Sequence, residues 1–146
     1  PTWKAIGDTF PHKITHGTES ELGSPAGLDL TVEAAEAAVS AERLGQGKAP
    51  DLLALSFSSH DYVGHSFGPD SRENEEMVAA EDRAIARLLG FLAKRVPGGL
   101  KNIVVALTAD HGVSPSADWL AAHRVNAGMV DSRELRDRLE ERVFFE

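Results

Sequence analysis

Four side chains in this sequence are of the types and at the spacings that can bind metal ions. Asp61 precedes His65 by four positions, and Asp110 is followed directly by His111. Carboxylate oxygen and imidazole nitrogen are the ligands that Zn²⁺ and related divalent ions take in hydrolases. Two such ions about 4 Å apart can hold the attacking and leaving oxygens of a phosphoryl transfer. We therefore interpret the two Asp/His pairs as candidate halves of a two-metal centre.

The elements expected to position these pairs are two buried strands and a helix between them. Each pair follows a short apolar run, at 52–57 and at 102–108, which is typical of a strand buried on both faces. An amphipathic pattern over 73–94 predicts a long helix between them. Strand, helix and strand in this order indicate a right-handed βαβ unit with parallel strands. Because ligands gather at the carboxyl ends of parallel strands, we expect the two pairs to meet there.

The rest of the chain is expected to extend this α/β unit. Residues 1–28 are rich in Gly, Pro, Thr and Ser, and we expect them to be irregular. Thr31 is expected to cap a helix that ends before Gly45. Further expected elements are a short helix at 119–124, a last helix that Ser132 caps and that runs to Arg142, and the start of a strand at 143–146. Residues 1–146 are predicted to form a single partial domain.

Composition excludes several classes of function. The net charge of −8 disfavours a nucleic-acid polymer, because phosphate binding needs a basic face. No apolar run approaches the roughly 18 residues of a membrane span. The chain has no cysteine, which excludes disulfides, thiolate ligands and a cysteine nucleophile. It begins at Pro1 rather than Met, so we expect a processed or partial chain.

Plainer explanations exist for each group taken alone. A single Asp after a strand is more often a cap, and a single His is usually a surface or satisfied core residue. We expect His60 to point away from Asp61, because neighbouring side chains of an extended segment point apart. A serine hydrolase is disfavoured because no Gly-x-Ser-x-Gly elbow is present. Neither the remaining histidines nor the serines near the first apolar run lie in a pattern that indicates a metal ligand or a nucleophile. These residues are His12, His16, His123, Ser56, Ser58 and Ser59.

The metal-ligand motifs and their surroundings resemble the alkaline phosphatase superfamily. The resemblance is to the branch of phosphate-irrepressible alkaline phosphatases and type I phosphodiesterase/nucleotide pyrophosphatases. It extends over most of the chain, and the two metal motifs are specific. The segments that carry it, in order, are Phe10-Pro11-His12, Ser24-Pro25 through Leu30-Thr31, Pro50-Asp51-Leu52-Leu53, Ser58 to Pro69, Asp82-Arg83 and Leu107 to Gly112.

The resemblance implies an alkaline-phosphatase-like three-layer sandwich with a mostly parallel sheet and two zinc ions in one site. Asp61 and His65 would bind one ion, and Asp110 and His111 the other. It also implies an upstream Asp, a Thr or Ser nucleophile and a late His, none of which maps onto this chain. Thr2, Thr9 and His123 lack the required context, which includes a preceding strand for either threonine.

These observations predict the metal-ligand segment of a two-metal phosphoric ester hydrolase that acts on a small phosphate ester. The chain alone is expected to be inactive, and the resemblance implies a periplasmic or extracellular location for the full-length family. A homodimer through an exposed sheet edge is also expected. The alternatives are a non-catalytic domain of the same fold that uses its acidic surface for protein contacts, and a sulfatase or phosphomutase relative.

Overall fold

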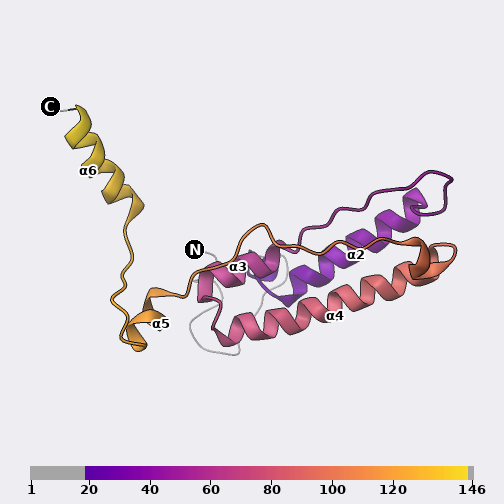
Figure 1. Cartoon of the computed structure of the whole chain (residues 1–146), viewed down its shortest axis with the longest axis horizontal. Helices are drawn as coiled ribbons and strands as arrows, with labels where there is room; N and C mark the ends of the chain where they lie inside the picture. The colour runs from indigo at the N-terminus through magenta and orange to yellow at the C-terminus, as the bar shows by residue number, and fades with distance from the viewer. Residues whose placement is uncertain (1–18, 145–146) are drawn as a thin grey trace. The chain divides into compact units, whose positions relative to one another are not determined.

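The computed structural model describes residues 19–144, and over this range the chain is helical or extended (Figure 1). It divides into two compact units, residues 1–114 and 115–146. The described helices are α1 (Glu19–Leu22), α2 (Pro25–Glu42), α3 (Ser58–Phe67), α4 (Arg72–Arg95), the 3₁₀ helix η2 (Gly99–Asn102), α5 (Ala117–Ala122) and α6 (Ser132–Phe144).

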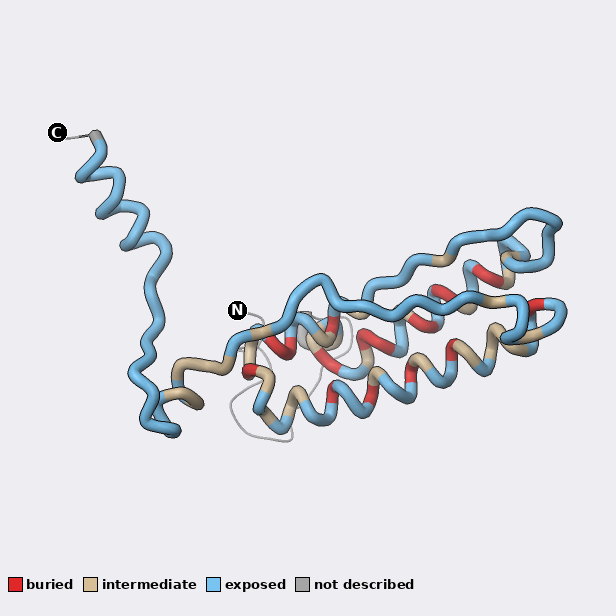
Figure 2. The backbone as a smooth tube through the Cα atoms, in the orientation of Figure 1, coloured by how far each residue is buried: buried red, intermediate tan, exposed pale blue. Residues whose placement is uncertain are grey.

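Helices α2 and α4 lie side by side and form the core of the first unit together with α3. Apolar residues recur along each helix at spacings of three or four, so one face of each is buried. Figure 2 shows the buried residues concentrated on these three helices. The core residues are Leu28, Val32, Ala35, Val63, Met77, Ala80, Ala84 and Leu88.

Helix α2 begins earlier than the sequence analysis placed it. Ser24 is the N-cap, and its hydroxyl accepts a hydrogen bond from the backbone N–H of Ala26 at 3.3 Å, with Pro25 in the first turn. Thr31, expected to be the cap, lies inside the helix and donates to the Gly27 carbonyl at 3.0 Å. Residues 19–22 and 25–28, expected to be irregular, are therefore helical; residues 1–18 lie outside the described range.

Helix α4 confirms the long helix expected between the two apolar runs. Its N-cap is Ser71, whose hydroxyl accepts from the backbone N–H of Asn74 at 3.1 Å. On its surface Arg87 donates to both carboxylate oxygens of Glu36 on α2, at 3.1 and 2.8 Å. The pKa of Arg87 is raised above its usual value, mainly by the hydrogen bond to Glu36. The two long helices are thus joined at their surface as well as in their core.

The expected βαβ unit and parallel sheet are wrong for this structure. No strand is assigned anywhere in residues 19–144, and the runs at 52–57 and 103–109 are extended but unpaired. Several of their apolar side chains face solvent: Leu52 is 90% exposed and Val104 is 97% exposed. An isolated pair of strands is at best marginally stable, and a parallel pair is weaker than an antiparallel one. Without further strands on either side, the two runs gain too little from pairing.

The second unit contains two helices, and the strand expected at its end is absent from the described residues. Helix α5 spans Ala117–Ala122 and is capped by Ser116, close to the expected position. Ser132, expected to be the cap of the last helix, is the first residue of α6, and Asp131 Oδ1 instead accepts from the backbone N–H groups of Arg133 and Glu134 at 2.8 and 3.3 Å. The helix continues to Phe144, so residues 143 and 144 are helical rather than the start of a strand. Among the described residues, no helix combines the length and apolar character that a membrane crossing requires. The single partial domain expected for residues 1–146 stays a prediction.

Candidate functional site

Asp61 and His65 lie on helix α3, which places them on one face. The sequence analysis read their segment as a loop after a strand, but residues four apart in a helix are neighbours on its surface. The Asp61 Oδ1 and His65 Nε2 atoms are 3.2 Å apart. Asp61 is in the first turn and His65 in the last, so each sits at the helix end that suits a carboxylate or an imidazolium.

His111 reaches the same place from the extended segment that follows 103–109. Its Nε2 lies 3.6 Å from Asp61 Oδ1, and its ring centre lies 5.5 Å from that of His65. The segment is held against α3 at Gly64, where a Cβ would stand 3.1 Å from Val113 Cγ2. The missing side chain at Gly64 therefore lets the chain carrying His111 approach the helix closely.

Together, Asp61, His65 and His111 form a candidate site for one metal ion. One ligand atom from each lies within 4.8 Å of the other two. Zn²⁺ holds its nitrogen and oxygen ligands at about 2.0–2.1 Å, which separates tetrahedral ligand atoms by about 3.3 Å. The measured separations of 3.2 and 3.6 Å are close to that value. All three side chains are about half exposed, so solvent or a small molecule could reach a bound ion.

Asp110 lies next to this group but is not part of it. Its Oδ1 accepts a hydrogen bond from the backbone N–H of His111 at 3.1 Å, and its side chain is 89% exposed. Its Oδ2 is 3.7 Å from His111 Nε2. The structure thus brings three of the four predicted ligands into one cluster, and Asp110 lies beside His111 at its edge.

The histidines outside the predicted pairs have other partners where they are described. The His60 ring faces Glu81 and Asn74 on α4, and His123 stacks on Trp119 with ring centres 3.7 Å apart. His12 and His16 lie outside the described residues, as do Thr2 and Thr9.

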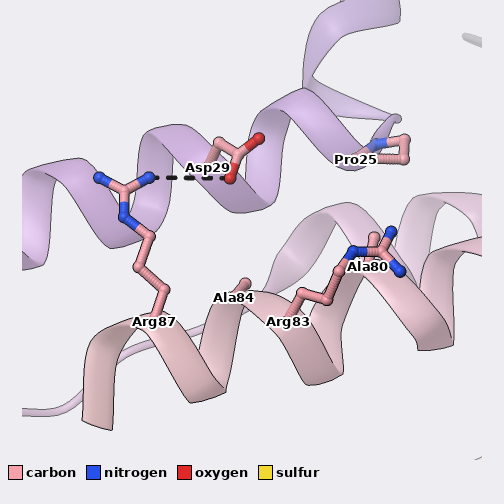
Figure 3. A pocket seen from close by; sticks show the side chains of 6 residues that line it. All are labelled: Pro25, Asp29, Ala80, Arg83, Ala84 and Arg87. Atoms are coloured by element: carbon pink, nitrogen blue, oxygen red, sulfur yellow. Dashed lines mark ion pairs between the residues drawn. The ribbon is translucent and has the colours of Figure 1, made fainter. Parts of the chain in front are cut away.

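A surface pocket of about 280 Å³ lies between α2 and α4 and shares no residue with the metal cluster. Figure 3 shows Arg83 and Arg87 projecting from α4 along this pocket, with Asp29 of α2 opposite. The Arg87 charge is balanced by three carboxylates, including Asp29 at 3.8 Å and Glu36 at 2.8 Å. Arg87 therefore contributes little net positive charge to the pocket.

The helical placement of Asp61 and His65 is the feature that sequence reasoning missed. A spacing of four residues is itself a helix signal, since it places two side chains on one face. Ser58 and Ser59 begin the helix directly after the apolar run, and Gly68-Pro69 follows its end. Reading 58–67 as a helix would have predicted that the two ligands act together, independently of any sheet.

The comparisons with known proteins match the class of enzyme that such a cluster suggests. The family model described as type I phosphodiesterase / nucleotide pyrophosphatase matches residues 4–139. The description of that family model is of a class of phosphoric ester hydrolases. The chain belongs to the type I phosphodiesterase / nucleotide pyrophosphatase family, as its motifs led us to expect. No solved structure matches the chain significantly.

Three curated relatives illustrate the match. The chain is 36% identical over 125 residues to alkaline phosphatase PafA of Elizabethkingia meningoseptica, covering 82% of this chain and 22% of that protein. It is 41% identical over 110 residues to alkaline phosphatase PhoV of Synechococcus elongatus, covering 73% and 20%. A protein of Myroides odoratus named calcium-transporting ATPase is 34% identical over 142 residues, covering 92% and 26%. The chain thus spans about a quarter or less of the length of these relatives.

Proposed function

We propose that this chain supplies the metal-ligand segment of a metal-dependent phosphoric ester hydrolase. The observation that carries the proposal is the convergence of Asp61, His65 and His111, whose ligand atoms lie within 4.8 Å of one another. Family membership supports it, because residues 4–139 match a family of phosphodiesterases. The nucleophile, a Thr or Ser, would come from a part of the enzyme that this chain does not contain.

The donor set of this cluster fits a divalent cation. One carboxylate and two imidazoles are a ligand set that catalytic zinc sites use, with a further position open to water or substrate. Bound there, the ion would supply Lewis acidity and lower the pKa of an oxygen nucleophile. Asp61 would offset part of the ion's charge, and the half-exposed imidazoles would leave one side open to solvent. Asp110, exposed and adjacent, is the residue that would serve a second ion in the whole enzyme.

The substrate of the whole protein is proposed from family membership, and its location from the family resemblance alone. We propose a small phosphate ester as substrate and a periplasmic or extracellular location. The relatives named alkaline phosphatase and the phosphodiesterase family model support the substrate class. The net charge of −8 disfavours a nucleic-acid polymer, since neutralising many phosphates requires a basic surface.

Zinc binding by the purified chain tests the proposal. We expect one Zn²⁺ per chain, measured by elemental analysis and by competition with a chromogenic chelator. Asp61→Ala should abolish binding, because Asp61 is within 3.6 Å of both imidazoles. Glu76→Ala is the matched control: it removes an exposed carboxylate of α4 that is not part of the cluster, and should change affinity less than twofold. Equal losses in the two variants would contradict the three-ligand site.

Catalysis requires a separate test. We expect the chain alone to hydrolyse no aryl phosphate at a measurable rate, even with zinc present, because the Thr or Ser nucleophile that the family resemblance implies maps onto no position of this chain. Turnover that disappears in the Asp61→Ala variant would show that the chain contains its own nucleophile. That result would overturn the proposed role as a segment of a larger enzyme.

We also propose that two chains associate through the exposed apolar residues of the extended segments. Leu52, Val104 and Leu107 are between 74% and 97% exposed, although apolar side chains of this size are usually buried. Their backbone groups are also unpaired over 103–109, which favours pairing with another chain. Sedimentation at high concentration should reveal a dimer, and replacing Val104 and Leu107 with Lys should abolish it. A monomer at all concentrations would contradict this proposal.

A further inference from the structure

The ring of His60 joins helix α3 to helix α4 at two points. His60 Nδ1 is paired with Glu81 Oε2, and His60 Nε2 lies 3.2 Å from Asn74 Oδ1. The side chains of His60 and Glu81 are 32% and 20% exposed, so this contact is more protected from water than the metal cluster. His60 is the residue immediately before Asp61.

The orientation of the Asn74 amide is fixed by a second hydrogen bond. Asn74 Nδ2 donates to the Pro69 carbonyl at 3.1 Å, so Oδ1 is the atom turned toward His60. Glu81 offers a carboxylate oxygen to the other ring nitrogen. Both ring nitrogens therefore face oxygen atoms of side chains on α4. Two directional contacts on one ring restrain both its place and its rotation.

We propose that His60 is a positioning residue, which sets the rotation of α3 about its own axis and thereby places Asp61 and His65 for metal binding. The inference rests on the proposed metal-binding function and names a residue that the metal motifs do not include. His60 and Asp61 are about 100° apart around the helix, because successive residues of an α-helix turn by that angle. When α4 holds the His60 side chain in place, α3 cannot rotate freely. The directions in which Asp61 and His65 point are then fixed as well.

The required accuracy shows why such a restraint matters. The functional atoms of a helix side chain lie roughly 5–6 Å from the axis, so a rotation of about 5° moves them by roughly 0.5 Å. Metal–ligand distances hold to about 0.2 Å. A small rotation of α3 is therefore enough to move Asp61 and His65 out of register with His111, which comes from a different segment.

Two other features of α3 are less directional. The helix has ten residues, and its N-cap residue, Phe57, makes no side-chain capping hydrogen bond. Val63 is buried in the apolar core, where dispersion contacts are non-directional. The hydrogen bonds of His60 to Glu81 and Asn74 supply the directional part of the attachment.

The test compares zinc affinity with stability in matched variants of the chain. We expect His60→Ala and Glu81→Ala each to weaken Zn²⁺ binding about tenfold, the low end of the effect seen for residues that orient metal ligands. Alanine is a good helix former, so the Glu81→Ala variant should keep α4 intact. It provides the test of the contact if the His60→Ala variant fails to fold. Glu81→Gln, which keeps an acceptor for the ring, should restore affinity to within about twofold. The double variant His60→Ala/Glu81→Ala should bind zinc no more weakly than His60→Ala alone, because His60→Ala already removes the contact with Glu81.

Arg87→Ala is the control for a merely structural effect. Arg87 also joins two helices through a carboxylate, Glu36, but it lies between α2 and α4 and outside the metal cluster. It should lower the midpoint of unfolding without changing zinc affinity. If His60→Ala lowers stability as Arg87→Ala does but leaves zinc affinity unchanged, His60 is structural and the inference is overturned.

A metal-free measurement separates this inference from the proposed function. In the zinc-free chain, Glu81→Ala should shift the backbone amide resonances of Asp61 and His65, whereas Arg87→Ala should not. Unchanged α3 resonances would overturn the positioning role. Failure of the unmodified chain to bind zinc would instead count against the proposed metal site, and the amide shifts would still decide what His60 does.

Discussion

Gly64 allows a direct test of how the metal cluster is assembled. Gly64 is on α3 next to His65, and a Cβ added there would stand 3.1 Å from Val113 Cγ2. Carbon atoms in favourable contact are about 3.5–4.0 Å apart, so Gly64→Ala should push Val113 away by roughly 0.4–0.9 Å. Val113 is two residues from His111, and the exposed segment between them can transmit this shift.

We expect Gly64→Ala to lower the affinity for zinc without lowering the stability of helix α3. A shift of roughly 0.5 Å exceeds the tolerance of about 0.2 Å for a metal–ligand distance, so His111 should lose its place relative to Asp61. We expect zinc affinity to fall about tenfold, which corresponds to about 1.4 kcal/mol. Replacing a helical glycine with alanine favours the helix by up to about 1 kcal/mol, which offsets the tighter contact.

The assay is zinc competition alongside urea unfolding, with Gly90→Ala as the matched control. Gly90 is also helical, but a Cβ there meets nothing within 4 Å. It should stabilise the chain by about 0.5–1 kcal/mol and leave zinc affinity unchanged. If Gly64→Ala binds zinc as tightly as the unmodified chain, the close approach of Val113 does not place His111, and the reasoning fails.

Three further outcomes are expected. Met77→Ala, at a fully buried position, should cost about 2–5 kcal/mol in urea unfolding, whereas Val78→Ala, at a half-exposed position, should change stability by about 0.5 kcal/mol or less. Gly27→Ala should cost about 1–3 kcal/mol, because the new Cβ would lie 2.8 Å from a backbone carbonyl oxygen, and Ser59→Ala should not rescue it. Zinc affinity should fall as pH falls, by up to about a hundredfold per pH unit at acid pH, since two imidazoles must each lose a proton; affinity independent of pH would exclude histidine ligands.

Local signals in the sequence predicted the helices well and the sheet wrongly. The period of apolar residues and the cap at Ser71 lie within a single segment, so α4 could be predicted almost to its ends. The apolar runs at 52–57 and 103–109 carry the local signal of a buried strand, but a strand exists only when a partner supplies its hydrogen bonds. That information is not in the run itself, and in this structure both runs stay extended and unpaired.

The sequence by itself determined the family and the identity of the candidate ligands. The residue types of Asp61, His65, Asp110 and His111, and their spacing, are chemical facts that do not depend on the fold. Family membership follows from the match over residues 4–139.

Tertiary structure decided which ligands meet. Helix α3 places Asp61 and His65 on one face, and the contact between Gly64 and Val113 brings His111 to them while Asp110 stays exposed. The physical reason is that metal ligation depends on distances of a few ångströms between segments remote in sequence. Those distances are set by side-chain packing between α3 and its neighbours, and no local pattern encodes them.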